Sequence, residues 1–433
     1  MLDQVYPPTL SRRAFAILFA SSLIMAIANT GLMSLLPVIG RSLAIPDTMV
    51  TSVFVFSALM WAAFTPFWTK AADRMDRKIL IMISLMGIVF AKLLMGLVVT
   101  VGLLHMAPPM VILALLVVSR GCFGALASAS TPAIQAIIGE GTRPEDRTQA
   151  MANLAGAFGL GTVVGPFFAP LFILPIVGLA GPLYVFSLMG VAALVVTWRY
   201  LGKSLPPPLP VRTADGEPQK RVRIWRDPRV TPFLWYSLLT AACQTSIGLT
   251  LGFLVIDKLA IEPLASQGFI ALAMMFGALS GLLGQWGLIR MFQMTPRHLL
   301  RWGVALAALG NLIVAVAPNY WSVVVGFAIA CLGFAFARPG AAAGSSLAVE
   351  LHEQARVGGA FSIVGVMTMT VAPVYVMLYE RVHWAPFAVN VVMMLGLLVY
   401  AYTNTQLRNA DPKPTSRLET VLATVERNDS GGV

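Results

Sequence analysis

The sequence predicts an all-α membrane protein with twelve transmembrane helices in two pseudo-symmetric six-helix bundles. Composition is the first reason, because 58% of the 433 residues are hydrophobic and only 11% are charged, whereas a soluble domain carries roughly 25% charged residues. The second reason is that twelve apolar runs reach or approach the about 20 residues that cross a bilayer as a helix. The third is one long hydrophilic connection, at 199–230, which divides these runs six and six.

Each run is expected to form one helix, because none shows the residue-by-residue alternation of a barrel strand. The first run is too long for the apolar part of a secretory signal and lacks a small-residue cleavage site, so we expect it to be retained. The ninth run is short. The predicted spans are 14–38, 50–69, 79–104, 109–137, 149–175, 181–198, 231–256, 267–289, 302–318, 320–346, 357–379 and 384–404.

These spans define four segments. We expect an N-terminal bundle at 1–198, a cytoplasmic linker at 199–230, a C-terminal bundle at 231–404 and a disordered cytoplasmic tail at 405–433. The two halves also resemble each other weakly, as expected for an internal repeat. Glu140 and Pro166 in the first half have counterparts at a similar offset, Glu350 and Pro373, in the second.

The positive charges predict the orientation in the membrane. The net charge is +11, and twelve spans place both termini on one side, together with most of the 30 Lys and Arg residues. The opposite side holds Arg41, Lys258 and Arg381. Because cytoplasmic loops carry the positive excess, we expect a multi-pass protein of the inner (plasma) membrane with both termini in the cytoplasm. Topology and contact with anionic lipid headgroups then explain the basic stretch 220–229 without a nucleic-acid partner.

The sequence offers little for catalysis. Its three cysteines, Cys122, Cys243 and Cys331, lie within spans and form no disulfide framework or metal-binding spacing. The four histidines are scattered, no nucleophile–base pair stands out, and there is no phosphate-binding loop. A channel would need a filter motif or rings of polar groups, and none is evident. We therefore expect no enzyme, no cofactor and no metal.

Three stretches carry a resemblance to a known family. "TKAADRMDRK" (69–78) follows the second run, "RGCFG" (120–124) lies in the fourth and "GTVVGPFFAP" (161–170) lies in the fifth. They resemble the motifs G-x-x-x-D-R-x-G-R-K/R, R-x-x-x-G and G-x-x-x-G-P-x-x-G-G of the major facilitator superfamily, and most closely those of its twelve-span drug:proton antiporters of the tetracycline-exporter type. The resemblance covers nearly all of 14–404 and implies two bundles that rock about a central site.

The first motif implies a charged latch that joins the bundles in one state and breaks in the other. Thr69 and Asp76 depart from the two glycines of the family pattern, and in the family an acidic residue at the end of span four joins the cluster, which here is Glu140. The alternative is a basic loop that only sets topology. The predicted latch residues are Asp73, Arg74, Arg77, Lys78 and Glu140.

The third motif predicts close helix packing and a bend in span five. Gly161 and Gly165 make a flat face for a neighbouring helix, and Pro166 removes one backbone hydrogen bond, which permits a kink. In the family, this motif is associated with antiporters. The resemblance therefore favours export over uptake.

Charges within the spans predict the type of solute. Only Lys92, Arg120 and Arg338 lie inside spans, and no Asp or Glu lies deep in any of them. Arg120 falls ~16 Å from the start of its span, where a charge facing lipid would cost at least about 2.5–3.5 kcal/mol, so we expect it to face protein or water. A pocket with Arg120 and Arg338 would favour an anion. We expect Lys92, on a peripheral third span, to extend toward the membrane surface.

Uncharged polar residues are expected to complete the site, although each has interhelical hydrogen bonding as an alternative role. The candidate substrate-binding residues are Arg120, Arg338, Asn29, Gln135, Gln244 and Gln285. By position, Asp73, Glu140 and Asp257 are the groups that could carry a proton; otherwise the proton would accompany the solute. The alternative to a binding role for Arg338 is that it lies late in its span and extends to the cytoplasmic surface of the membrane.

We therefore expect a secondary active transporter that moves a small anionic or amphiphilic solute by alternating access. Proton-coupled efflux, of the kind that underlies multidrug resistance, is the favoured direction. Its expected partners are the solute, protons and the lipid bilayer, and we expect it to act as a monomer. Uptake or exchange of an organic anion, and a non-transporting receptor or scaffold, are the alternatives.

Overall fold

A computed structural model describes residues 10–72, 74–142, 144–202, 227–349 and 354–411, apart from some side chains in α5, α6 and α13. Seven helices lie in the described part of the first half. They are α1 (Arg12–Ser42), α2 (Asp47–Ala72), α3 (Arg77–Leu103), α4 (Pro109–Ala127), α5 (Ser130–Gly141), α6 (Pro144–Leu171) and α7 (Gly181–Tyr200).

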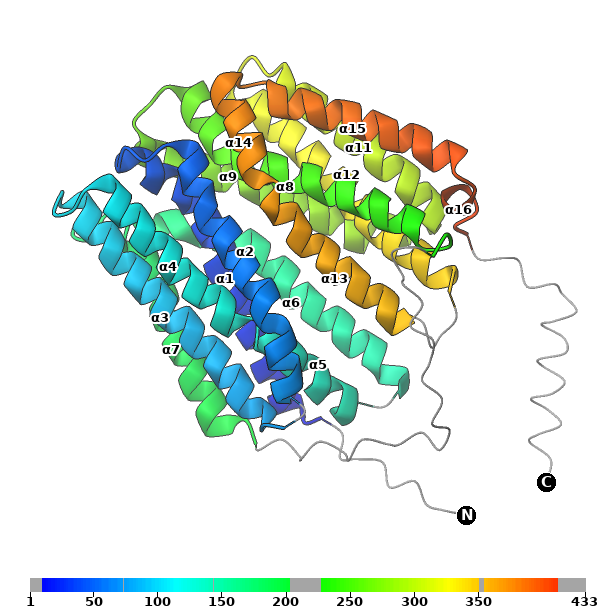
Figure 1. Ribbon diagram of the computed structural model, residues 1–433, viewed down its shortest axis with the longest axis horizontal. Coiled ribbons are helices and arrows are strands. Elements are labelled where there is room, and N and C mark those ends of the chain that lie inside the picture. The colour runs from blue at the N-terminus through cyan, green and yellow to red at the C-terminus, as the bar shows by residue number, and fades with distance from the viewer. Residues whose placement is uncertain (1–9, 73, 143, 203–226, 350–353, 412–433) are drawn as a thin grey trace, which may run out of the picture.

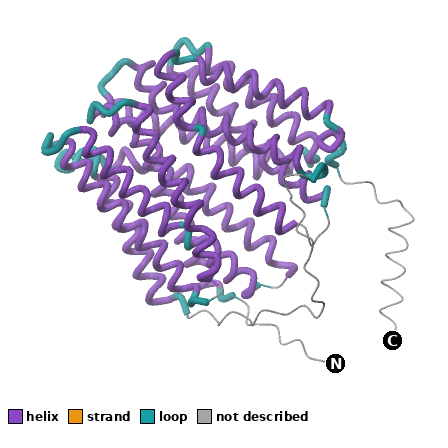
Figure 2. The backbone as a smooth tube through the Cα atoms, viewed as in Figure 1, coloured by secondary structure: helices purple, strands orange, loops and turns teal. Residues whose placement is uncertain are grey.

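The second half follows the linker. Its helical elements are α8 (Thr231–Leu259), α9 (Pro263–Leu282), the π-helical turn η2 (Leu283–Leu288), α10 (Ile289–Met291), α11 (Pro296–Ala315), α12 (Tyr320–Leu347), α13 (Gln354–Thr370), α14 (Ala372–Arg381), α15 (Ala385–Thr403) and α16 (Thr405–Arg408). Figure 2 shows that helix dominates the described chain. The all-α fold class predicted from the sequence is confirmed.

Ten helical segments of the described chain are long and apolar enough to cross a membrane, with α4–α5 and α9–η2–α10 each forming one segment. The positions of the fifth and eleventh predicted spans are occupied by α6 and by the α13–α14 pair. The α13–α14 break falls just before Pro373, which lies in the first turn of α14, where its missing N–H removes no helical bond. In contrast, α6 continues as one helix through Pro166 and Pro170.

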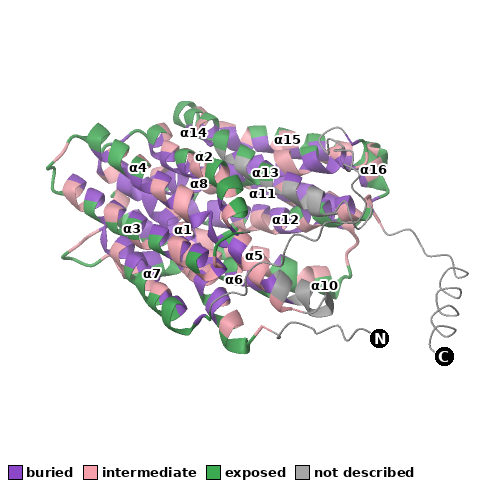
Figure 3. Ribbon diagram, turned by 60° about the horizontal axis from the view of Figure 1, so that its bottom comes forward, coloured by how far each residue is buried: buried purple, intermediate pink, exposed green. Residues whose placement is uncertain are grey.

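The helices form two groups that match the halves of the sequence. In Figure 1, α1–α7 pack mainly with one another, as do α8–α16. Small residues allow the closest contacts. A Cβ added at Gly310 of α11, for example, would lie 2.3 Å from the backbone nitrogen of Ala330 on α12. Figure 3 colours the helices by burial and shows buried and exposed residues on the same helices. The exposed residues include many large apolar ones.

The helix connections lie at two opposite ends of the bundle. We call the end that carries the start of α1, the end of α7, the start of α8 and α16 the terminal side. The distal side carries the connections at 43–46, 104–108, 172–180, 260–262, 316–319 and 382–384. The sequence predicts that the terminal side faces the cytoplasm.

The sequence predicts a disordered tail from residue 405, but the structure has the short helix α16 there. Asn404 caps α16 by accepting hydrogen bonds from the backbone N–H groups of Gln406 and Leu407, at 3.0 and 3.3 Å. Leu407 and Ala410 are buried, and the Asp411 carboxylate accepts a bond from the Arg297 N–H at 3.1 Å. Apolar burial and one cap therefore order residues 405–411, and the rest of the predicted tail lies outside the described residues.

Candidate functional site

A charged cluster joins the two halves on the distal side. Arg41 of α1 donates from Nε to Asp47 of α2 at 2.7 Å and from Nη1 to Asp257 of α8 at 3.0 Å. The hydroxyl of Tyr379, on α14, donates to the other Asp257 oxygen at 2.6 Å. We call Arg41, Asp47, Asp257 and Tyr379 the distal clasp. Because Arg41 bridges carboxylates from both halves, the clasp holds the distal side closed in this structure.

Two further contacts cross between the halves near the clasp. The backbone N–H of Thr48 donates to the Glu380 carboxylate of α14 at 2.7 Å, and the Thr48 hydroxyl bonds the same group. Closer to the middle of the membrane, the buried Gln267 amide of α9 donates to the Ser34 hydroxyl of α1 at 3.3 Å. The distal half of the interface is therefore held by polar groups as well as by packing.

The contact between α1 and α8 loosens toward the terminal side. At the distal end, a Cβ on Gly252 would lie 2.5 Å from the Pro37 ring. One turn along, a Cβ on Gly248 would lie 3.5 Å from the end of Met33. The next turn carries Gln244, which is exposed although α8 is the most buried of the membrane-crossing helices. We call the facing sides of these two helices the α1–α8 seam, and it separates at Gln244.

The same spacing brings Asn29 to the separating end of the seam. Asn29 precedes Met33 by one turn on α1, as Gln244 precedes Gly248 on α8, and it is half-buried. Behind it lies Arg120 of α4, which donates from Nη2 to the Asn29 side-chain oxygen. Two of the predicted site residues, Asn29 and Arg120, therefore meet directly.

Arg120 is buried but only partly bonded. Its guanidinium carbon lies 4.3 Å from the ring centroid of Phe123 and 5.3 Å from that of Phe54, and the residue is 4% exposed. Its Nε and Nη1 atoms have no hydrogen-bond partner within the described part of the chain. A guanidinium carries its full set of donors in a fixed plane, so those two atoms can still bind an acceptor.

Lys92 does not extend to the membrane surface as the sequence suggested. It is completely buried in α3, and its Nζ lies 5.8 Å from the centroid of the Phe123 ring. No described side chain or carbonyl accepts a hydrogen bond from this amine. Phe123 therefore contacts two buried nitrogen groups, one from α3 and one from α4.

Two of the other predicted site residues are exposed in the structure. Gln285 lies in η2, and Arg338 lies in the half of α12 that is nearer the terminal side. Their contribution to the site remains a prediction. The side chain of Gln135 lies outside the described residues.

The predicted latch is described only in part. Arg77 is buried, Arg74 is exposed, and the Lys78 amine donates to the Trp198 backbone oxygen at 2.8 Å. Asp76 begins α3 by accepting a bond from the Lys78 N–H at 2.9 Å. Asp73 and the Glu140 side chain, on which the latch depends, lie outside the described residues, so the latch remains a prediction.

Gly161 and Gly165 allow α6 to pack closely on α1. A Cβ on Gly161 would lie 2.3 Å from that of Ala26, and one on Gly165 would lie 2.3 Å from the Thr30 hydroxyl oxygen and 2.7 Å from the Ile27 carbonyl. Thr30 donates to the Gly161 carbonyl at 2.9 Å, which is possible only at such a short separation. Glycine at these positions therefore serves helix contact.

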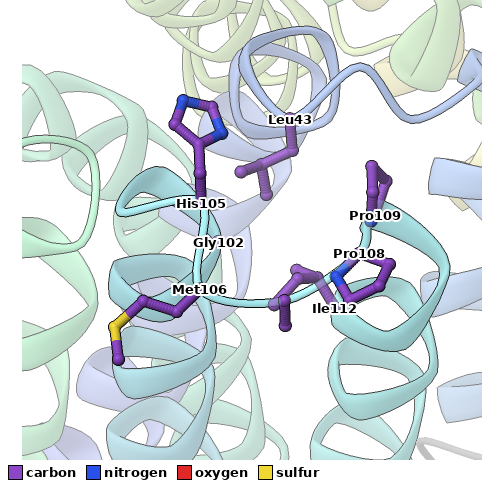
Figure 4. A pocket seen from close by; sticks show the side chains of 8 residues that line it. Leu43, Gly102, His105, Met106, Pro108, Pro109 and Ile112 are labelled. Carbon is purple, nitrogen blue, oxygen red and sulfur yellow. The ribbon is translucent and has the colours of Figure 1, made fainter.

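Two pockets lie away from this interface. The first, of about 390 Å³, lies on the distal side where the α3–α4 connection passes the end of α1, and Figure 4 shows Leu43, His105, Pro108 and Ile112 around it. The second, of about 460 Å³, is mostly apolar and lies between the η2 region, α11 and α12, with Phe292, Trp302 and Phe336 in its lining. Neither contains a predicted site residue.

Comparison with known families identifies the fold. The sequence profile of the Major Facilitator Superfamily matches residues 18–296. The chain belongs to this superfamily. It is therefore a multi-pass membrane protein built as a secondary transporter and not as an enzyme.

Several solved structures share the fold at low sequence identity. A peptide transporter POT in complex with sulfate has a TM-score of 0.71 at 12% identity, over 94% of this chain and 98% of that one. A POT family transporter in complex with 5-aminolevulinic acid gives 0.70 at 14%, over 92% and 99%. A bacterial homologue of the human lysosomal transporter Spinster, inward-facing and occupied, gives 0.66 at 12%, over 93% and 98%. The curated proteins contain no match.

Two features of this site could not be predicted from the sequence: the pairing of Arg41 with Asp257 and the burial of Lys92. The sequence predicts that Arg41 lies on the distal side and offers Asp257 as a group that could carry a proton, but it contains no indication that the two pair. Lys92 was treated as peripheral because it lies on the third span. The structure shows the reason for its burial one turn further along α3: a Cβ on Gly96 would lie 2.8 Å from the Tyr184 ring, so this face of α3 is packed against protein.

Proposed function

We propose that this superfamily member carries a small anionic solute across the inner (plasma) membrane, with its terminal side in the cytoplasm. The observation that carries the proposal is Arg120, a buried guanidinium with two unbonded nitrogen atoms beside the separating end of the α1–α8 seam. Buried charges are normally paired. An acidic group of the solute is a partner of suitable charge and geometry.

The distribution of carboxylates supports an anion over a cation. Among the described residues of the membrane-crossing helices, the buried carboxylate is Asp47, and Arg41 holds it in the distal clasp. Among the described residues, a cationic solute would find no carboxylate beside Arg120 to bind it, and it would be repelled by Arg120. Arg338, which is exposed in α12, is the cation that we expect the second half to add.

Alternating access follows from the asymmetry of the interface. The clasp closes the distal side while the seam separates toward the terminal side, so the solute site communicates with the terminal side in this state. Breaking the clasp and closing the seam would give the opposite state. The predicted latch at 69–78, with Glu140, would then form on the terminal side.

Two directions of transport follow from different observations. The motif of span five resembles that of the drug:proton antiporters and favours efflux. The buried Arg120 and Lys92, with no carboxylate near them among the described residues, favour uptake of an organic anion, because a solute anion and a proton would stabilise each other in the same site. Transport in sealed vesicles of known orientation, with the acidic side reversed between samples, distinguishes the two.

The experiment that tests the anion assignment is a counterflow screen in proteoliposomes. Benzoate, citrate and inorganic phosphate are compared with a permanently cationic dye, using wild-type protein, Arg120→Ala and the control Arg199→Ala, which removes an exposed arginine at the end of α7. We expect counterflow of at least one anion, lost in Arg120→Ala and kept in Arg199→Ala. Movement of the cationic dye alone, or full activity of Arg120→Ala, would refute the proposal.

A further inference from the structure

Lys92 is a fully buried lysine without a hydrogen-bond partner in the described chain, and the transport cycle above gives it no role. It lies near the middle of α3, which spans Arg77–Leu103, and none of its surface is exposed. Its amine has no hydrogen-bond partner in the described chain. A lysine with a purely structural role would donate its three hydrogens to carbonyl or carboxylate oxygens, and Lys258 does this by donating to the Ala317 carbonyl at 2.6 Å.

The surroundings of Lys92 contain another cation but no described anion. The helices packed on α3 are α1, α2, α4, α5 and α7. Arg120 and Cys122 come from α4, and α7 contributes Tyr184, whose hydroxyl shares a 2.8 Å hydrogen bond with Thr100, about two turns from Lys92. Asp47 of α2 is held in the clasp, and the Glu140 side chain of α5 lies outside the described residues. Arg120 is thus the charged group that acts on Lys92.

The two nitrogen groups belong to one site. Lys92 and Arg120 both lie against the Phe123 ring, with Nζ at 5.8 Å and the guanidinium carbon at 4.3 Å from its centroid. The Lys92 amine and the Arg120 Nε and Nη1 atoms are all buried and unbonded within the described chain. A second full positive charge would be strongly unfavourable here without an anion, whereas lysine can lose its proton and arginine cannot.

We propose that Lys92 is the proton-binding group of the transport cycle. Its amine is uncharged while Arg120 holds no solute, and it takes up one proton when the carboxylate or phosphate group of a solute binds Arg120. The inference rests on the proposed anion transport and supplies its coupling step. The amine lone pair binds a proton from water at the open side and returns it to water at the other side, so no covalent bond of the solute changes.

This assignment has a direct consequence for direction. Solute anion and proton occupy the site together and leave it together, which makes the process a symport. For a solute with one negative charge, the pair carries no net charge. A proton gradient directed into the cell then drives uptake, which favours uptake over the efflux that the motif of span five suggests.

The test separates solute movement from proton coupling in proteoliposomes. Counterflow of benzoate, citrate and phosphate at equal pH on both sides reports solute movement, and accumulation of the same probes with acid outside reports coupling. Lys92→Met is expected to retain measurable counterflow at saturating probe but to lose accumulation above the equilibrium level. Lys258→Met, in which a lysine bonded to a carbonyl is lost, is the matched control and is expected to keep both.

The outcomes distinguish the two proposals. Accumulation by Lys92→Met equal to that of wild type overturns the role of Lys92 while leaving anion transport intact. Absence of anion counterflow in wild type, or its persistence in Arg120→Ala, overturns the proposed function instead. In wild type, the Cε resonance of isotope-labelled Lys92 should be that of an uncharged amine and change to that of an ammonium on adding a transported probe. An ammonium signal before the probe is added contradicts the proposal.

Discussion

Replacing Asp257 by Asn should open the distal side of the protein. Asp257 accepts bonds from Arg41 at 3.0 and 3.3 Å and from the Tyr379 hydroxyl at 2.6 Å, and it is the carboxylate through which Arg41 reaches the second half. Asn keeps the shape but removes the charge. Arg41 then keeps its bonds to Asp47, within its own half, and the strongest polar link between the halves is lost.

The size of the effect follows from the geometry. A hydrogen bond to a charged group contributes about 1.5–3 kcal/mol, and the side chains of Arg41 and Asp257 are 31% and 19% exposed, which weakens the pair toward the lower end. A loss of about 2 kcal/mol changes the ratio of open to closed distal sides by roughly 30-fold. The Thr48–Glu380 and Gln267–Ser34 bonds remain, so part of the population should stay closed.

Distance measurements between spin labels can detect this shift. Labels at Met106 and Val316, both exposed on distal connections of opposite halves, report the separation of the two distal ends. Wild type should give one short distance, and Asp257→Asn should add a longer one. Glu262→Gln, which removes an exposed carboxylate at the start of α9 that caps no backbone group, should resemble wild type. Identical distance distributions for Asp257→Asn and Glu262→Gln would refute the role of the clasp.

Three further predictions concern stability. Gly165→Ala should destabilise the detergent-solubilised protein by about 1–3 kcal/mol, since its Cβ would meet the Thr30 hydroxyl and the Ile27 carbonyl at 2.3 and 2.7 Å; an unchanged melting temperature would contradict close α1–α6 packing. Lys92→Met should raise the melting temperature, because an apolar side chain replaces an unbonded buried amine, and a fall would indicate a structural bond. Arg229 lowers the pKa of Asp227. This pair therefore stabilises the fold above the ordinary Asp pKa of about 3.9 and loses that contribution as pH falls through the lowered value. Asp227→Asn should be less stable than wild type at pH 7, and a stability gap that does not shrink as the pH is lowered below the ordinary Asp pKa would be inconsistent with this.

The fold could be predicted because the bilayer imposes simple rules on the sequence. Apolar runs of sufficient length, the hydrophilic stretch 199–230 and the absence of alternation together led to the all-α class. The helix ends were less certain, since charged residues such as Arg77 and Arg297 extend helices beyond their apolar runs. The predicted tail also begins with a short helix, because Asn404 caps it and Leu407 is buried. Here local packing outweighs the polar composition on which the prediction of disorder rested.

The site could be predicted only in part, because a sequence shows which residues are costly to bury but not what they meet. The cost of a charge placed Arg120 in the interior, and its partner Asn29 was among the polar candidates. The pairing of Arg41 with Asp257 depends on two helices far apart in the chain, and no spacing within either helix reports it. Lys92 could have been either peripheral or buried, and only the packing of α3 on α4 and α7 decides between them.

The central claim is that Arg120 binds the acidic group of a transported anion. A structure of the protein with the anion found in the counterflow screen tests this most directly. The account predicts density for its carboxylate or phosphate group within hydrogen-bond distance of the Arg120 Nε or Nη1 atoms, with the seam between Asn29 and Gln244 nearby. Density for the anion at a place remote from Arg120, with that guanidinium still unbonded, would contradict it.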